Sequence, residues 1–215
     1  SFIIQAQLDP AFWQNPMPFP DVERTAYYAQ AVRDLAIAGT LEGYEDGTFK
    51  PDRPINRAEF FKMALFEFLS KDKITLEEYD KFTDLSEKDW HFQYMELAKQ
   101  LGVIEPDKEG RFFPNQTISR MEALTMILKI YDIETEKPAE EPQDSEEGET
   151  EDGPQENLEP VPFTDIPADY PSVTAIRAGI EHGLLGQLGT AFKPSQPVTR
   201  AEVAYWVWKL KFDYL

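Results

Sequence analysis

Three arginines occupy equivalent positions of a recurring four-residue string, and their placement indicates a partner of negative charge. Arg57, Arg120 and Arg200 are the second residues of Asn-Arg-Ala-Glu, Ser-Arg-Met-Glu and Thr-Arg-Ala-Glu. Each string has the spacing of a capping box, so each arginine is expected in the first turn of a helix. A cation there meets the positive end of the helix dipole, which is unfavourable. A misfit that occurs three times indicates that something negative lies beside it.

Two kinds of negative partner are open for these arginines. An internal partner would be an aspartate of the Phe-x-Asp strings, namely Asp21, Asp84 or Asp165. An external partner would be a carboxylate or phosphate, held by the arginines together with free backbone amides at the helix N-termini. Both interpretations can hold in different copies of the string.

Aromatic and basic residues recur near the same strings. An aromatic residue stands near the start of each expected first helix, at Tyr27, Trp90 and Tyr170. Such a ring is either part of the core or a floor for the face of a sugar. Lys50 and Lys193 occupy equivalent loop positions, where they are either solvated or add a second cation to an anion site.

The sequence predicts no catalytic residue, no metal site and no cofactor. Its two histidines, His91 and His182, lie outside any metal-ligand spacing, and cysteine is absent. There is no Gly-x-Ser-x-Gly string, and the glycines of 183–189 do not form a dinucleotide fingerprint. Carboxylate pairs are plentiful, but the repeats leave no room for a catalytic domain. A carboxylate glycosidase survives as an alternative only if the chain is a fragment of a longer protein.

The candidate residues belong to a unit that occurs three times, which makes the repeat the main feature of the chain. The copies align over residues 19–60, 82–123 and 163–203. Phe19 and Phe82 are 63 residues apart, as are Arg57 and Arg120, and the third copy has one residue fewer in its middle loop. In every copy a loop phenylalanine precedes the box arginine by eight positions, at Phe49, Phe112 and Phe192.

Each copy is expected to form two helices joined by a loop. In the first copy, apolar residues follow the spacing of one buried helical face, at Tyr28, Ala31, Val32, Leu35 and Ala36. This first helix should end at a glycine in the left-handed region, which is Gly39, Gly102 or Gly183. The second helix begins at the capping box. One such pair cannot bury its own apolar faces, so we expect an all-α fold in which the three copies pack together.

Charge is unevenly distributed and argues against several partners. Of the net charge of −19, the segment 134–160 carries −11, from 12 acidic residues and one lysine, and the remainder carries −8. The segment is rich in Glu and Pro and is expected to be an extended, disordered-like linker. No basic stripe is present, which argues against nucleic acid. No apolar run approaches the roughly 20 residues of a membrane span, so no membrane insertion is expected.

The strings Phe-x-Asp, Gly-Tyr-Glu-Asp-Gly-Thr-Phe-Lys-Pro and Thr-Arg-Ala-Glu resemble the S-layer homology domain, which usually comprises three tandem motifs. The resemblance covers 19 to about 210, apart from the acidic segment. It implies a pseudo-threefold, three-pronged spindle that binds a secondary cell-wall polysaccharide, often carrying ketal-linked pyruvate, in grooves between motifs. It also implies glycan contacts by a set of residues: Arg57, Arg120, Arg200, Tyr27, Trp90, Tyr170, Gly47, Lys50 and Lys193. The loop of the second copy departs from the pattern, with Pro106-Asp-Lys-Glu-Gly110 in place of Gly-Tyr-x-Asp-Gly.

These observations together predict the organisation and the function. We expect an N-terminal extension (1–18), motif 1 (19–69), motif 2 (82–133), the acidic linker (134–160) and motif 3 (163–215), which are called copies one, two and three below. The predicted function is non-covalent anchoring of a surface protein to the bacterial cell wall, outside the cell, through an acidic polysaccharide. Other surface-layer proteins are further expected partners. The alternative is a protein–protein interaction module in an S-layer lattice or envelope complex.

Overall fold

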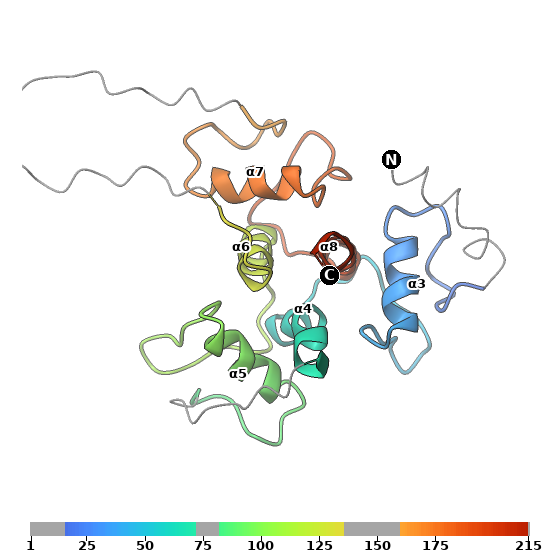
Figure 1. Ribbon diagram of the computed structural model, residues 1–215, viewed down its shortest axis with the longest axis vertical. Coiled ribbons are helices and arrows are strands. Elements are labelled where there is room, and N and C mark those ends of the chain that lie inside the picture. The colour runs from blue at the N-terminus through green and yellow to red at the C-terminus, as the bar shows by residue number, and fades with distance from the viewer. Residues whose placement is uncertain (1–15, 72–81, 136–159, 215) are drawn as a thin grey trace, which may run out of the picture.

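The computed structural model describes residues 16–71, 82–135 and 160–214, in which helices alternate with loops (Figure 1). The helices are α3 (Ala29–Ile37), α4 (Arg57–Lys71), α5 (Phe92–Gln100), α6 (Arg120–Ile130), α7 (Val173–Glu181) and α8 (Arg200–Tyr214). Within the described ranges, β-pairing is limited to three isolated bridges, so the predicted all-α class is confirmed. Most of the predicted acidic linker (136–159) and of the N-terminal extension (1–15) lies outside the described residues.

The first helix of each copy ends at the predicted glycine. In copy one, Gly39 has a φ of 75°, a left-handed conformation that glycine adopts without steric cost. The amide of Thr40 then donates to the carbonyl oxygen of Leu35 (2.9 Å), as in a Schellman motif. Gly102 and Gly183 have φ values of 66° and 68° at the same position. The loop therefore leaves each first helix in the same direction.

The second helix of each copy begins at the predicted capping box. The third amide of each helix donates to the side chain of the cap residue: Glu59 to Asn56 (2.8 Å), Glu122 to Ser119 (3.2 Å) and Glu202 to Thr199 (3.3 Å). In copies one and three the glutamate accepts in return from the amide of Asn56 (3.2 Å) or Thr199 (2.9 Å). Each cap satisfies amides that an isolated helix would leave without partners.

The copies interlock around a pseudo-threefold axis. The second helices α4, α6 and α8 lie side by side at the centre, and the first helices α3, α5 and α7 lie outside them (Figure 1). Each outer helix packs on the central helix of the preceding copy: α5 on α4, α7 on α6, and α3 on α8. The last contact joins the first copy to the third, so the repeat closes on itself. This is the predicted three-pronged spindle.

A ring of three backbone hydrogen bonds fixes the starts of the central helices. It runs from Ile55 N to Val198 O (3.1 Å), from Val198 N to Ile118 O (3.0 Å), and from Ile118 N to Ile55 O (3.3 Å). The three side chains are completely buried. Because each ring residue lies two positions before a box arginine, the ring sets the relative positions of the three arginines.

The core lies between the central helices and the loops. Its largest fully buried side chains include Trp206, Phe60 and the loop phenylalanines Phe49 and Phe192. The loop phenylalanine of copy one stacks on Phe19, with ring centroids 5.7 Å apart. No helix in the part of the chain that the structure describes is long and apolar enough to cross a membrane.

Candidate binding groove

Each box arginine reaches into the next copy rather than into solvent. A side-chain nitrogen donates to the carbonyl oxygen of the loop phenylalanine in that copy: Arg57 Nε to Phe112 (3.1 Å), Arg120 Nη1 to Phe192 (2.6 Å) and Arg200 Nε to Phe49 (2.9 Å). Arg120 and Arg200 are buried, and Arg57 is largely so. The arginines therefore have internal partners that join neighbouring copies.

The aspartates of the Phe-x-Asp strings do not pair with the arginines, so the prediction that these aspartates are the internal partners is wrong. In copy one, Asp21 accepts from the amides of Phe49 (2.8 Å) and Lys50 (2.7 Å). Asp84 and Asp165 make the same pair of bonds in the other copies. These bonds hold Lys50 at a φ of 57°, a left-handed conformation that is strained for a residue before proline.

The expectation of free amides at the helix N-termini is also wrong. The first two amides of α4, from Arg57 and Ala58, donate to the carbonyl oxygens of Gln116 (2.9 Å) and Pro114 (3.0 Å) in copy two. The same arrangement joins α6 to copy three and α8 to copy one. The loop of each copy thus caps the helix of its neighbour, and an anion could not use these amides without displacing the loop.

The charge on the three arginines is balanced differently. Arg57 pairs with Glu122, and Arg120 Nε pairs with Glu202 Oε1 at 2.9 Å, in each case with the box glutamate of the next copy. The third interface breaks this pattern because Arg53 binds Glu59 with bonds of 2.7 and 2.9 Å. Other bonds take the place of that pair for Arg200.

Arg200 bonds to backbone oxygens and rings instead of a carboxylate. Besides the Phe49 carbonyl, its Nη2 donates to the carbonyl oxygen of Glu42 (2.5 Å). Its guanidinium lies over the rings of Tyr44 and Phe49, 4.7 and 4.8 Å from their centroids. Its positive charge is thus held by dipoles and ring faces, which leaves it the best placed of the three box arginines to attract an added anion.

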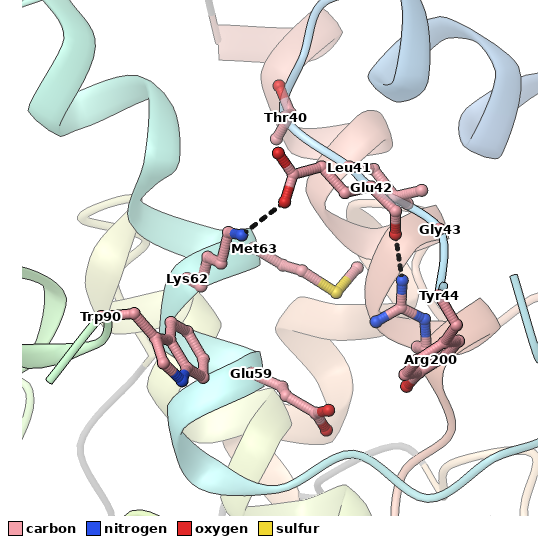
Figure 2. A pocket seen from close by; sticks show the side chains of 10 residues that line it. All are labelled: Thr40, Leu41, Glu42, Gly43, Tyr44, Glu59, Lys62, Met63, Trp90 and Arg200. Carbon is pink, nitrogen blue, oxygen red and sulfur yellow. Dashed lines mark hydrogen bonds and ion pairs between the residues drawn. The ribbon is translucent and has the colours of Figure 1, made fainter. Parts of the chain in front are cut away.

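A cavity of about 170 Å³ opens beside Arg200, and all three copies contribute to it (Figure 2). We call it the Trp90 groove. Its lining residues are Thr40, Leu41, Glu42, Gly43, Tyr44, Glu59, Lys62, Met63, Trp90 and Arg200. They come from the loop after α3, from α4, from the segment before α5 and from the start of α8. The groove therefore exists only when the copies are assembled.

The groove combines an exposed indole with a second cation. Trp90 is 54% exposed, which is unusual for so large an apolar side chain. Lys62 Nζ lies 5.6 Å from the centroid of its ring and 2.8 Å from Glu42 Oε2 (Figure 2). The hydrogen bond and charge of Lys62 lower the pKa of the Glu42 carboxyl, so this carboxyl is ionised at neutral pH. Such a set of groups can bind the face of a sugar together with a carboxylate.

The corresponding position of α8 is filled by protein. Tyr205 aligns with Lys62, and its ring meets that of Tyr27 edge to face, with centroids 5.4 Å apart. Tyr27 also packs on Tyr28, at 5.1 Å. Burial, and then the nearby Glu202 carboxylate, raise the pKa of the Tyr27 phenol, which stays neutral. Tyr27 is thus largely part of the packing between α3 and α8.

The remaining predicted residues lie outside the cavity lining. Lys50 Nζ binds Asp46 at 2.7 Å and lies 4.4 Å from the ring centroid of Tyr44, so it contacts a lining residue of the Trp90 groove without lining it. Gly47, Lys193 and Tyr170 are not among the lining residues, and neither are Arg57 and Arg120. The structure therefore brings together Arg200 and Trp90 from the predicted set, and Lys50 contacts the Tyr44 ring beside them.

Sequence reasoning missed Glu42, Tyr44 and Lys62. Tyr44 lies within the Gly-Tyr-Glu-Asp-Gly string, so its position carried a signal. Lys62 carried none, because its counterparts are Thr125 and Tyr205 and the repeat does not preserve it. Among the described residues, no group of three or more histidines and carboxylates could hold a metal ion.

Three interlocked helix–loop–helix copies that close on themselves, with an open groove between them, define a helical repeat module. The family model described as "S-layer homology domain" matches residues 18–61, 81–124 and 162–204. These matches cover more than half of the chain, which therefore belongs to the S-layer homology family. Membership of this family, together with its cell-surface relatives, indicates that the chain is an anchoring module of the cell surface.

The chain is similar to parts of much longer surface proteins. It is 33% identical to "Cell surface glycoprotein 1" of Acetivibrio thermocellus over 53% of the chain and 5% of the relative. It is 27% identical to the "Cellulosome-anchoring protein" of the same organism, over 77% of the chain and 33% of that protein. Similarity to an "Amylopullulanase" of Thermoanaerobacterium thermosulfurigenes (28% identical) covers 79% of the chain but 8% of the enzyme. The chain thus spans a third or less of each of these relatives.

Proposed function

We propose that the chain anchors a surface protein non-covalently to the bacterial cell wall by binding an acidic secondary cell-wall polysaccharide, such as a pyruvylated one, in the Trp90 groove. The observation that carries this proposal is the grouping of an exposed indole, Lys62 and Arg200 in one cavity. Names of relatives that contain "cell surface" and "cellulosome-anchoring" support the anchoring part.

The groove has the chemistry that an acidic sugar requires. The apolar face of a pyranose ring can lie on the exposed face of Trp90, and the carboxylate of a pyruvate ketal can approach Lys62 Nζ, which lies above the same ring. Arg200 adds positive charge at the inner end, where its bonds to carbonyl oxygens leave its charge without a direct carboxylate partner among the described residues. The face of the sugar and its charge are thus recognised by different side chains.

The proposal is tested by sedimentation with purified wall sacculi, before and after chemical removal of the polysaccharide. We expect binding to be lost with the polysaccharide and to fall by about tenfold in Trp90→Ala. Phe212→Ala is the matched control, because Phe212 is also an exposed ring, at 61%, but lies outside the cavity lining. Equal binding to intact and stripped sacculi would reject the glycan and point to a protein partner in the wall.

A further inference from the structure

The charges that line the Trp90 groove cancel. Two are positive, on Lys62 and Arg200, and two are negative, on Glu42 and Glu59. The chain as a whole carries −19, so an anion approaching the groove gains nothing from the net field of the protein. Arg200 is only 8% exposed, so an acidic ligand that is to pair directly with an accessible cation needs one of the lining carboxylates to give up its own cation.

The carboxylate of Glu59 cannot give up its cation without disturbing the helix. Its carboxylate binds Arg53 Nη1 at 2.7 and 2.9 Å and also accepts from the amide of Asn56 at 3.2 Å. The bond from the Asn56 amide closes the capping box of α4, so moving the Glu59 side chain would remove part of the helix cap. Its side chain is well covered, with 18% exposed.

Glu42 is in the opposite situation. Its side chain is 72% exposed, and its carboxylate contacts Lys62 Nζ at 2.8 Å. An ion pair this open to water is weak, because solvent screens it and both side chains lose freedom in forming it. The backbone of residue 42 is nevertheless held, since its carbonyl oxygen accepts from Arg200 Nη2. The carboxylate can therefore swing into water while the loop stays in place.

This step rests on the proposed function and deepens it. We propose that Glu42 is a built-in competitor for the ligand: its carboxylate occupies the position on Lys62 that a carboxylate of the glycan takes, and it is released to solvent when the glycan binds. The exchange replaces one ion pair by another, so Glu42 limits the gain that a carboxylated sugar makes on Lys62 and leaves the affinity for neutral sugars unchanged. Neutral sugars leave the Glu42–Lys62 pair intact and gain contact with Trp90 alone.

The arrangement is particular to this groove. Lys62 aligns with Thr125 in copy two and Tyr205 in copy three, whereas Glu42 aligns with Glu105 in copy two and Gly186 in copy three. Neither counterpart of Lys62 carries a charge, so no equivalent exchange can take place at the other two positions. The Glu42–Lys62 pair is thus found at one of the three similar interfaces between copies.

The exchange is tested by calorimetric titration of the full chain with a hexosamine methyl glycoside that carries a pyruvate ketal, and with its methyl ester. We expect Glu42→Gln to bind the acid about two- to fivefold more tightly than the unsubstituted chain does, and to bind the ester equally. Glu45→Gln is the matched control, because it removes the same charge from the same loop outside the groove lining. It should leave both affinities unchanged.

A second comparison identifies the released cation. In a Lys62→Met background, Glu42→Gln should no longer increase affinity for the acid, because no cation remains to be released. Unchanged or weaker binding of the acid by Glu42→Gln, or an equal gain for the ester or in Glu45→Gln, would overturn the exchange while leaving the proposed function intact. Failure of every chain, including the unsubstituted one, to bind the acid would overturn both.

Discussion

The box arginines hold neighbouring copies together. Arg120 is 5% exposed and donates to Glu202 and to two backbone oxygens, those of Phe192 (2.6 Å) and Lys193 (3.2 Å). A planar guanidinium can make these bonds at once, which lysine cannot. The unfavourable position of each arginine at the start of a helix is thus offset by carbonyl and carboxylate oxygens of the next copy.

Removal of Arg120 should therefore destabilise the whole chain. Arg120→Ala leaves the buried Glu202 carboxylate and the Phe192 carbonyl without their partner, and we expect a loss of about 3–5 kcal/mol in the free energy of unfolding. Urea unfolding followed by circular dichroism measures this loss. Lys88→Ala removes one positive charge from an exposed side chain and should change stability by less than about 0.5 kcal/mol. A near-neutral Arg120→Ala would mean that the inter-copy bonds contribute little.

Several loop carboxylates should make stability fall in acid. Hydrogen bonds from the Lys50 side chain and from Thr48 lower the pKa of Asp46 to about 2, and a backbone hydrogen bond from Arg111 lowers that of Asp107. Burial raises the pKa of Asp165, but bonds from the Phe192 and Lys193 amides outweigh it. These carboxylates bind fewer protons in the folded state than in the unfolded one, so their contribution to stability is complete above about pH 4 and is lost towards pH 2.

Urea midpoints measured from pH 6 to pH 2 test this expectation. The midpoint should be level down to about pH 4 and then fall. Asp46→Asn removes a group whose pKa is lowered to about 2 and should flatten the lowest part of the fall, near pH 2. A midpoint that rises in acid would show that protonation favours the folded state and would contradict the sign argued here.

At the scale of single residues, the sequence could predict only those groove residues that recur in the other copies. Arg200 and Trp90 recur in register with residues of the other copies, so both were found. Lys62 and Glu42 were missed because the Trp90 groove depends on side chains that differ between copies, and a repeat pattern carries no signal for those. The repeat pattern also could not identify the partners of the arginines, because these partners lie in the next copy.

At the scale of the helix, capping separates two serines that look alike in the sequence. Ser119 precedes α6 and accepts from the Glu122 amide at 3.2 Å. Ser172 precedes α7, but its side chain makes no cap hydrogen bond. The outer helices are short and are held by packing on the central ones, whereas the central helices begin at side-chain caps and neighbouring loops.

Substitution of these serines should therefore have unequal effects. Ser119→Ala should lower the free energy of unfolding by about 1 kcal/mol, because the Glu122 amide loses its acceptor. Ser172→Ala should change it by less than about 0.5 kcal/mol. Thermal and urea unfolding of both variants measure the difference, and equal losses would mean that the Ser119 cap contributes no more than any surface serine.

At the scale of the molecule, closure distinguishes this fold from an open repeat array. In a solenoid each repeat contacts only its neighbours along the chain, and stability adds up repeat by repeat. Here α3 packs on α8, and the ring of Ile55, Ile118 and Val198 needs one residue from each copy. The number of copies and the helix boundaries were predictable from spacing and capping boxes. The closure was supplied by family resemblance, because local patterns do not specify contacts between distant copies.

Closure predicts that the copies cannot fold separately. A chain that ends at residue 135 lacks α8, on which α3 packs, and Glu202, which pairs with Arg120. We expect this fragment to lose the fixed near-ultraviolet circular dichroism of its aromatic core and to unfold without a cooperative transition. The full chain should instead unfold in one transition, with coincident near- and far-ultraviolet signals. A fragment that melts cooperatively would show that two copies suffice, and stability would then follow the additive behaviour of an open array.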